Sequence, residues 1–199
     1  MSAVLKDILA TAVPTFRAKG YTGSGQNYRR ITETAVSVIN FQKSSGGERF
    51  YVNVGVQPLF VWTEGESMPV AKEIKEPECI FRERVDPPDG ESLGWRYSLE
   101  LSAALVQRFD MLYASFVVPL MTIPGPVTDA CIGDFPLDSV HPLLGARNAR
   151  NFLNFARIAL ATGNRERAEE FAIAALEICP PRASTLRFHL NKTLADAKT

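Results

Sequence analysis

The sequence predicts an α+β protein, with an N-terminal antiparallel sheet and flanking helices, followed by a C-terminal helical hairpin with a capping helix. Two observations carry this prediction. Residues 34–42 and 49–57 alternate apolar and polar side chains and flank Ser44–Gly47, a pattern typical of a β-hairpin. Apolar residues at helical spacing occur near both ends of the chain. Successive strands with helices at the ends favour an antiparallel sheet.

The first helix is predicted over about Val4–Lys19. Its apolar residues form one stripe that Lys6 and Asp7 interrupt, so we do not interpret it as a secretory signal peptide. Gly20 follows as a C-cap, because glycine adopts the left-handed conformation readily. Residues 21–27 are rich in glycine and polar side chains and predict a flexible turn.

The hairpin is predicted with Lys43 opposite Glu48 and Phe41 opposite Phe50. This register gives the sheet one apolar face and one polar face. The polar face is a candidate ligand-binding surface, predicted to carry Asn40, Gln42, Tyr51 and Asn53, joined by Arg82 and Arg84 from a neighbouring strand. The alternative is a solvated outer face with no ligand.

The remaining elements of the first domain are predicted from weaker sequence patterns. In order, they are a short strand at 59–63, a loop with a short helix at 64–78, a strand at 79–85, a turn-rich connection at 86–94 and a strand at 95–99. A helix then runs from Glu100 or Ser102 to about Leu120, with a buried stripe at Leu105, Phe109, Leu112 and Phe116. Its polar residues favour a core helix over a membrane span.

Three regions follow from this pattern. Residues 1–122 are predicted as the α+β domain, residues 123–144 as a linker and residues 145–199 as a helical module. The linker is predicted from its density of proline and glycine, although its apolar residues allow it to pack across a surface.

The C-terminal module has the spacing of a helical-hairpin repeat. Its apolar and small positions are Phe152, Phe155, Ala156 and Ala159 in the first helix, and Ala168, Ala172, Ala175 and Leu176 in the second, with a turn at Gly163 and Asn164 and a closing Pro180. This pattern resembles a single tetratricopeptide-like repeat, followed by a final helix at about 183–197. The resemblance implies a binding architecture without built-in chemistry.

The N-terminal part resembles a second family. The segments Phe16–Tyr21, Tyr28–Arg30, Val38–Ser44 and Phe50–Val56, with Asn40–Ser44 the most specific, resemble domain-of-unknown-function family 4304. The resemblance covers about the first 120 residues and implies a domain boundary near that point. It implies no particular activity.

Composition narrows the function classes. The formal net charge is zero, so the basic excess expected of a general nucleic-acid binder is missing, and self-association stays open. The three cysteines, Cys79, Cys131 and Cys179, are widely spaced and form no Cys-x-x-Cys pair. We therefore expect free thiols, no zinc or other metal site and a cytoplasmic location. We also expect no cofactor, no nucleic-acid partner and no membrane partner.

Catalytic motifs are missing from the sequence. Neither His141 nor His189 lies near an obvious nucleophile, and no Gly-x-Ser-x-Gly or His-Glu-x-x-His occurs. A carboxylate-based hydrolase stays open, because folding brings distant acidic residues together. The favoured hypothesis is a bacterial-type, non-enzymatic module that binds a protein or peptide. Asn154, Arg157 and Arg165 are predicted on the exposed sides of the repeat, where they would hold an acidic peptide.

Two hypotheses from other classes remain alongside it. One is a small-ligand-binding or hydrolytic pocket on the polar sheet face. The other is an inhibitor of the toxin-immunity type, which rests on analogy alone. For the helical module, the structural alternative is that its charges pair with one another on a solvated surface.

Overall fold

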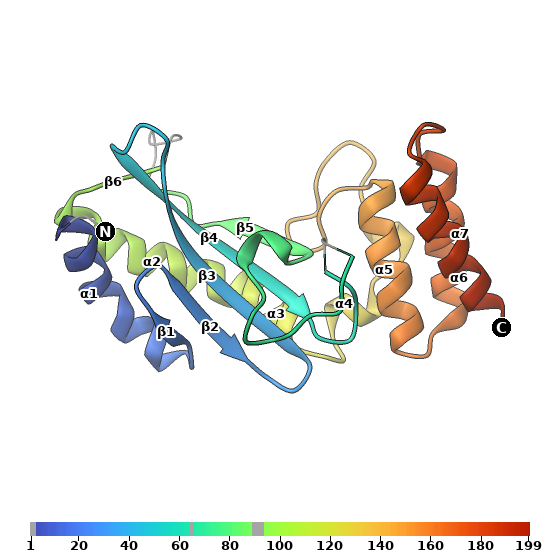
Figure 1. The fold of residues 1–199 in the computed structure, drawn as a ribbon, viewed down its shortest axis with the longest axis horizontal. Helices are drawn as coiled ribbons and strands as arrows, with labels where there is room; N and C mark the ends of the chain where they lie inside the picture. The colour runs from blue at the N-terminus through green and yellow to red at the C-terminus, as the bar shows by residue number, and fades with distance from the viewer. Residues whose placement is uncertain (1–2, 64–65, 89–93) are drawn as a thin grey trace. The chain divides into compact units, whose positions relative to one another are not determined.

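The computed structural model describes residues 3–63, 66–88 and 94–199, and within them the chain forms two compact units (Figure 1). The first unit consists of residues 3–59, 63, 69–88 and 94–121. The second consists of Phe60–Trp62, Glu66–Met68 and Thr122–Thr199. An antiparallel sheet with helices fills the first unit and helices build the second, so the predicted α+β class is confirmed.

The sheet of the first unit is antiparallel throughout. Its neighbouring strands are, in order, β1 (Thr22–Ser24), β2 (Asn27–Ile31), β3 (Ala35–Lys43), β4 (Arg49–Pro58) and β5 (Phe81–Arg84), and β6 (Trp95–Arg96) also pairs with β4. The two long predicted strands are confirmed. Residues 21–27, predicted as a turn, instead contribute to a hairpin, in which Thr22 lies opposite Arg29 and Ser24 opposite Asn27. Pairing of Tyr28 with Ile39 joins this hairpin to the rest of the sheet. The strand predicted at 59–63 is absent, since the chain turns there.

The pairing between β3 and β4 differs from the prediction by two residues. Phe41 lies opposite Val52, and Lys43 lies opposite Phe50. The reason is a wider turn, closed by a 2.9 Å hydrogen bond from the Ser44 amide to the Arg49 carbonyl. Because side chains alternate with a period of two, this shift keeps every side chain on its predicted face.

The apolar face of the sheet packs against α1 (Ala3–Ala18) and α2 (Ser102–Leu112). The ring of Phe16 on α1 lies 5.4 Å from that of Tyr28 and 4.7 Å from that of Phe109 on α2. α1 ends as predicted, with Gly20 at a φ of 84° and the Tyr21 amide donating to the Phe16 carbonyl at 3.0 Å.

The second helix of this unit is not uniform. It passes from η2 (Leu99–Leu101) through α2 and a π-helical turn, η3 (Tyr113–Val117), into α3 (Val118–Met121). Leu105, Phe109 and Phe116 are buried as predicted, but Leu112 is only half-buried. Val117, at the end of the π turn, is buried as well.

By length and composition alone, the helical run Leu99–Met121 is also able to cross a membrane. Within the described residues, 28% of its most apolar window is buried. Core helices of soluble proteins meet the same criteria.

The opposite face of the sheet is partly covered by residues 70–79, which include the short helix η1 (Glu76–Glu78). Val36 and Val38 pack there against Ile74 and Cys79. Gly55 makes this approach feasible, because a Cβ at that position would lie 2.7 Å from the Cys79 sulfur.

The second unit contains α4 (Pro126–Asp129), η4 (Ile132–Asp134), α5 (Ala149–Ala161), α6 (Arg165–Ile178) and α7 (Ser184–Lys198). The predicted helical hairpin is thus present, with Gly163 at a φ of 81° in its turn and Asn164 capping α6. The three long helices approach one another at small residues, where Ala159, Ala168 and Ala197 are buried together.

Residues 123–144, predicted as a linker, belong to the second unit. Phe135 is buried, and its ring lies 5.1 Å from Phe152, 5.0 Å from Phe155 and 5.9 Å from Phe171. This segment therefore supplies part of the core of the helical unit. Two predicted segments, the loop at 64–78 and the connection at 86–94, fall partly outside the described residues, at 64–65 and 89–93.

Candidate functional site

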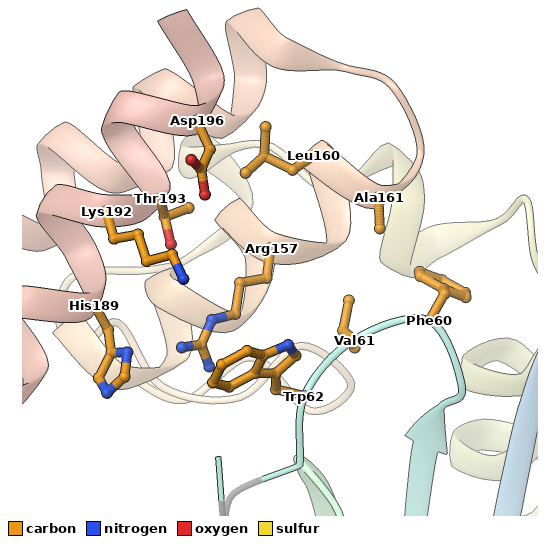
Figure 2. Close-up of a pocket in the computed structure, with 10 residues that line it drawn as sticks. All are labelled: Phe60, Val61, Trp62, Arg157, Leu160, Ala161, His189, Lys192, Thr193 and Asp196. Carbon is orange, nitrogen blue, oxygen red and sulfur yellow. The ribbon is translucent and has the colours of Figure 1, made fainter. Parts of the chain in front are cut away.

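A cavity of about 380 Å³ lies within the second unit (Figure 2). It combines apolar, aromatic and charged side chains. The lining residues are Phe60, Val61, Trp62, Arg157, Leu160, Ala161, His189, Lys192, Thr193 and Asp196. A volume and lining of this kind are typical of ligand sites.

Three segments build the cavity. α5 contributes Arg157, Leu160 and Ala161, which its helical period places on one face. α7 contributes the polar wall at His189, Lys192, Thr193 and Asp196, which repeats at the same spacing. The remaining wall is Phe60–Trp62, which follows β4 in the chain.

The basic side chains of the cavity lie around the ring of Trp62, as Figure 2 shows. The Arg157 guanidinium carbon lies 5.1 Å from the ring centroid and the Lys192 ammonium 5.9 Å from it. The His189 ring approaches it edge-on at 6.3 Å. A cation over an indole face is electrostatically favourable, so Trp62 helps to position Arg157 and Lys192.

Glu66 binds to Arg157 at the edge of this cluster. Arg157 donates from Nη2 to Glu66 Oε2 at 2.8 Å, and Arg150 donates from Nη1 to Oε1. His189 Nε2 lies 3.9 Å from Glu66 Oε2. Burial raises the pKa of Glu66, but the bonds from Arg157 and Arg150 and the proximity of His189 outweigh it, and the net shift is downward. Glu66 is therefore ionised at neutral pH.

The second terminal nitrogen of Arg157, Nη1, is buried and has no hydrogen-bond partner among the described residues. A buried donor without an acceptor costs about 1–3 kcal/mol, and more when it carries charge. Arg157 itself is held firmly, since its side chain is 13% exposed and lies against Trp62. The arrangement leaves a positioned donor that an acidic group would satisfy.

The three residues predicted on the surface of the helical module do not converge. Only Arg157 lines the cavity, where its side chain is 13% exposed and thus mostly covered, not exposed as predicted. Arg165 is exposed and donates to the Asp196 carbonyl at 3.0 Å. The predicted exposure of Asn154 is wrong: it is 4% exposed, because α5 is buried on all sides over residues 152–156.

The six residues predicted on the polar sheet face do share one face. Gln42 lies opposite Tyr51, Asn40 opposite Asn53, and Asn53 opposite Arg84. Asn53 donates to Gln42 Oε1 at 3.0 Å and accepts from Arg84 Nε at 3.2 Å. Most of the polar groups on this face are thus engaged with one another.

A shallow hollow of about 320 Å³ borders this face. Asn53, Arg82 and Arg84 line it, while Asn40, Gln42 and Tyr51 are not among its lining residues. Arg82 donates to the buried Glu76 at 2.8 Å, and Arg84 lies 4.3 Å above the Tyr51 ring. Internal partners thus occupy both guanidinium groups, which favours a structural role for this face.

The sequence pointed to Arg157 but missed its partners. His189, Lys192 and Thr193 were detectable in principle, because their spacing marks one face of the predicted last helix. Trp62 and Glu66 carried no such signal, since they lie about 90 positions earlier in a segment without periodicity. Within the described ranges, no group of three His, Cys, Asp or Glu side chains is placed to hold a metal ion.

Comparison with curated proteins and with solved structures gave no match in either case. A match to a family model spans the strands of the sheet from β1 to β6 and includes Trp62 and Glu66, whereas nearly all of α2 and the whole of α5 and α7 lie outside it. The predicted resemblance of the N-terminal part is thereby confirmed. Residues 12–102 of the chain match the family described as Domain of unknown function (DUF4304).

Proposed function

We propose that the protein is a non-enzymatic, cytoplasmic binding module for a protein or peptide, and that its second unit receives an acidic group of that partner. The observation that carries the proposal is the buried Nη1 donor of Arg157, which lacks an acceptor among the described residues and belongs to a side chain lining the cavity. A carboxylate oxygen would complete its hydrogen bonding.

The rest of the lining supports a peptide as the partner. Lys192 adds positive charge beside Arg157, and the Thr193 hydroxyl supplies a donor and an acceptor. Phe60, Val61 and Leu160 offer apolar contacts for an aliphatic side chain or chain end. Basic groups next to apolar side chains suit the carboxylate end of a peptide, or an acidic side chain next to an apolar one.

The arrangement of the helices is consistent with a tetratricopeptide-like module. α5 and α6 form an antiparallel hairpin, and α7 packs against both. Close contact at Ala159, Ala168 and Ala197 supports this reading. Helical repeats of this kind bind peptides on surfaces built from adjacent helices.

The test is peptide selection followed by one pair of variants. A random peptide library with free carboxyl ends is selected against the full chain, and the dissociation constant of the selected peptides is measured. We expect enrichment of acidic or carboxyl-terminal groups. We also expect Lys192→Ala to weaken binding about tenfold, which corresponds to about 1.4 kcal/mol.

Lys198→Ala is the matched control, because Lys198 lies on the same helix, pairs with Glu169 and does not line the cavity. Its binding is expected to stay unchanged. Equal loss in both variants, or selected peptides without acidic groups, would contradict the proposal.

A further inference from the structure

Glu66 already occupies the kind of position that an acidic ligand would take. Its two carboxylate oxygens accept from two different arginines, Oε1 from Arg150 and Oε2 from Arg157. Paired guanidinium groups around one carboxylate are a common way of binding an acidic ligand. Here the chain supplies that carboxylate itself, from a segment far from α5 in the sequence.

The backbone at Glu66 is unfavourable for this residue type. Its φ is 58°, in the left-handed region that residues with a side chain adopt at a cost. Such a conformation persists when surrounding contacts impose it. The Glu66 side chain is bound by Arg150 and Arg157 and lies near His189, and these contacts favour its position.

The contacts of Glu66 are also accessible. The Glu66 side chain is 24% exposed and that of Arg150 is 41% exposed. Ion pairs that reach solvent contribute little net stability, because water and salt screen them. A second carboxylate that also gains apolar contacts in the cavity would therefore compete effectively for the same guanidinium.

We infer, on the basis of the proposed function, that Glu66 is an internal substitute for the ligand, and that a ligand carrying a carboxylate beside an apolar group replaces it at Arg157. Glu66 then lowers the affinity of the free protein for such ligands and restricts binding to those with enough apolar contact. The ligand class is an apolar carboxylate, such as the carboxyl end of a peptide with an aliphatic last residue.

The test uses N-acetyl-leucine as the probe and N-acetyl-leucinamide as its uncharged counterpart. Binding to the full chain is followed by the indole N–H resonance of Trp62 in a nitrogen–proton correlation spectrum. We expect the acid, and not the amide, to shift this resonance. Glu66→Gln, which keeps the size of the side chain but removes its charge, is expected to bind the acid about tenfold more tightly.

Two further variants make the test decisive. Glu66→Ala removes the carboxylate by a different change and is expected to tighten binding as well. Glu169→Gln is the control, because Glu169 pairs with Lys198 away from the cavity lining, and its affinity is expected to match that of the unaltered chain. Unshifted resonances outside the cavity confirm that each variant is folded.

The possible failures are distinguishable. If the acid binds the unaltered chain but Glu66→Gln and Glu66→Ala bind it equally or more weakly, Glu66 positions Arg157 and the inference is wrong, while the proposed function stands. If neither the acid nor the selected peptides bind any variant, the proposed function itself fails.

Discussion

At the scale of single residues, burial separates the three thiols. Cys79 is fully buried under the sheet, where its sulfur contacts the Lys75 carbonyl at 3.6 Å. Burial, together with the negative charge of Glu76, raises the pKa of the Cys79 thiol. Cys179 is also buried, whereas Cys131 is exposed. The thiolate is the reactive form, so the raised pKa disfavours reaction at Cys79, and burial shields both Cys79 and Cys179. Accessibility therefore favours reaction at Cys131.

We therefore expect one fast-reacting thiol in the native protein. Titration with a chromogenic disulfide reagent at neutral pH should modify one equivalent rapidly, and the other two only after unfolding in denaturant. Cys131→Ser should abolish the fast phase without changing the total released by unfolding from the remaining two cysteines. Rapid modification of two or more thiols in the native state would show that Cys79 or Cys179 is accessible.

At the scale of elements, residues 122–148, between the sheet unit and α5, form part of the core of the helical unit. Its short helices α4 and η4 bring Phe135 onto the facing sides of α5 and α6, where Phe152, Phe155 and Phe171 surround it with edge-on contacts. Aromatic rings packed in this way contribute more than their buried area alone. The segment therefore closes an apolar surface that two helices by themselves would leave open.

Phe135→Ala should accordingly destabilise the protein strongly. We expect a loss of about 3–5 kcal/mol in the free energy of unfolding, because the substitution leaves a cavity among rigid rings. Leu137→Ala is the matched control, since Leu137 lies two residues away and is 78% exposed, and its effect should be small. Denaturant unfolding monitored by helical circular dichroism measures both. Similar losses in the two variants would contradict the packing of Phe135.

At the scale of the whole molecule, the two units are not two uninterrupted stretches of chain. The segments Phe60–Trp62 and Glu66–Met68 belong to the second unit, although they lie between strands of the first in sequence. Trp62 and Glu66 contribute the aromatic ring and the carboxylate that contact Arg157. The helical unit therefore depends on residues that a fragment beginning at residue 122 would lack.

Because of this dependence, we expect Trp62→Ala to destabilise the helical unit and not the sheet. Amide hydrogen exchange in α5 and α7 should become roughly tenfold faster, equivalent to about 1.4 kcal/mol, because Trp62 contacts Arg157, His189 and Lys192. Exchange in β3 and β4 should stay unchanged. Met68→Ala is the control, since Met68 lies in the other inserted segment and is exposed. Slow exchange retained in α7 would show that Trp62 does not stabilise the helical unit.

The sequence by itself determined the fold class, the two faces of the β3–β4 hairpin, the glycine that ends α1 and the positions of the three C-terminal helices. These features follow from local periodicity and capping, which each short segment expresses on its own. It also singled out Arg157, since an arginine on a helix of the predicted hairpin is visible in the pattern. The predicted pairing of β3 with β4 was shifted by two residues from the observed one. A shift of two leaves every side chain on the same face of the sheet, so the apolar and polar pattern does not distinguish the two registers.

Only the tertiary structure decided the composition of the candidate site. Trp62 and Glu66 meet Arg157 across more than 90 positions of sequence, and no periodicity links residues so far apart. The burial of Asn154 and the packing of Phe135 were settled in the same way, because both depend on which neighbouring helix covers a given face. Local physical chemistry sets the elements, and contacts between distant segments set the site.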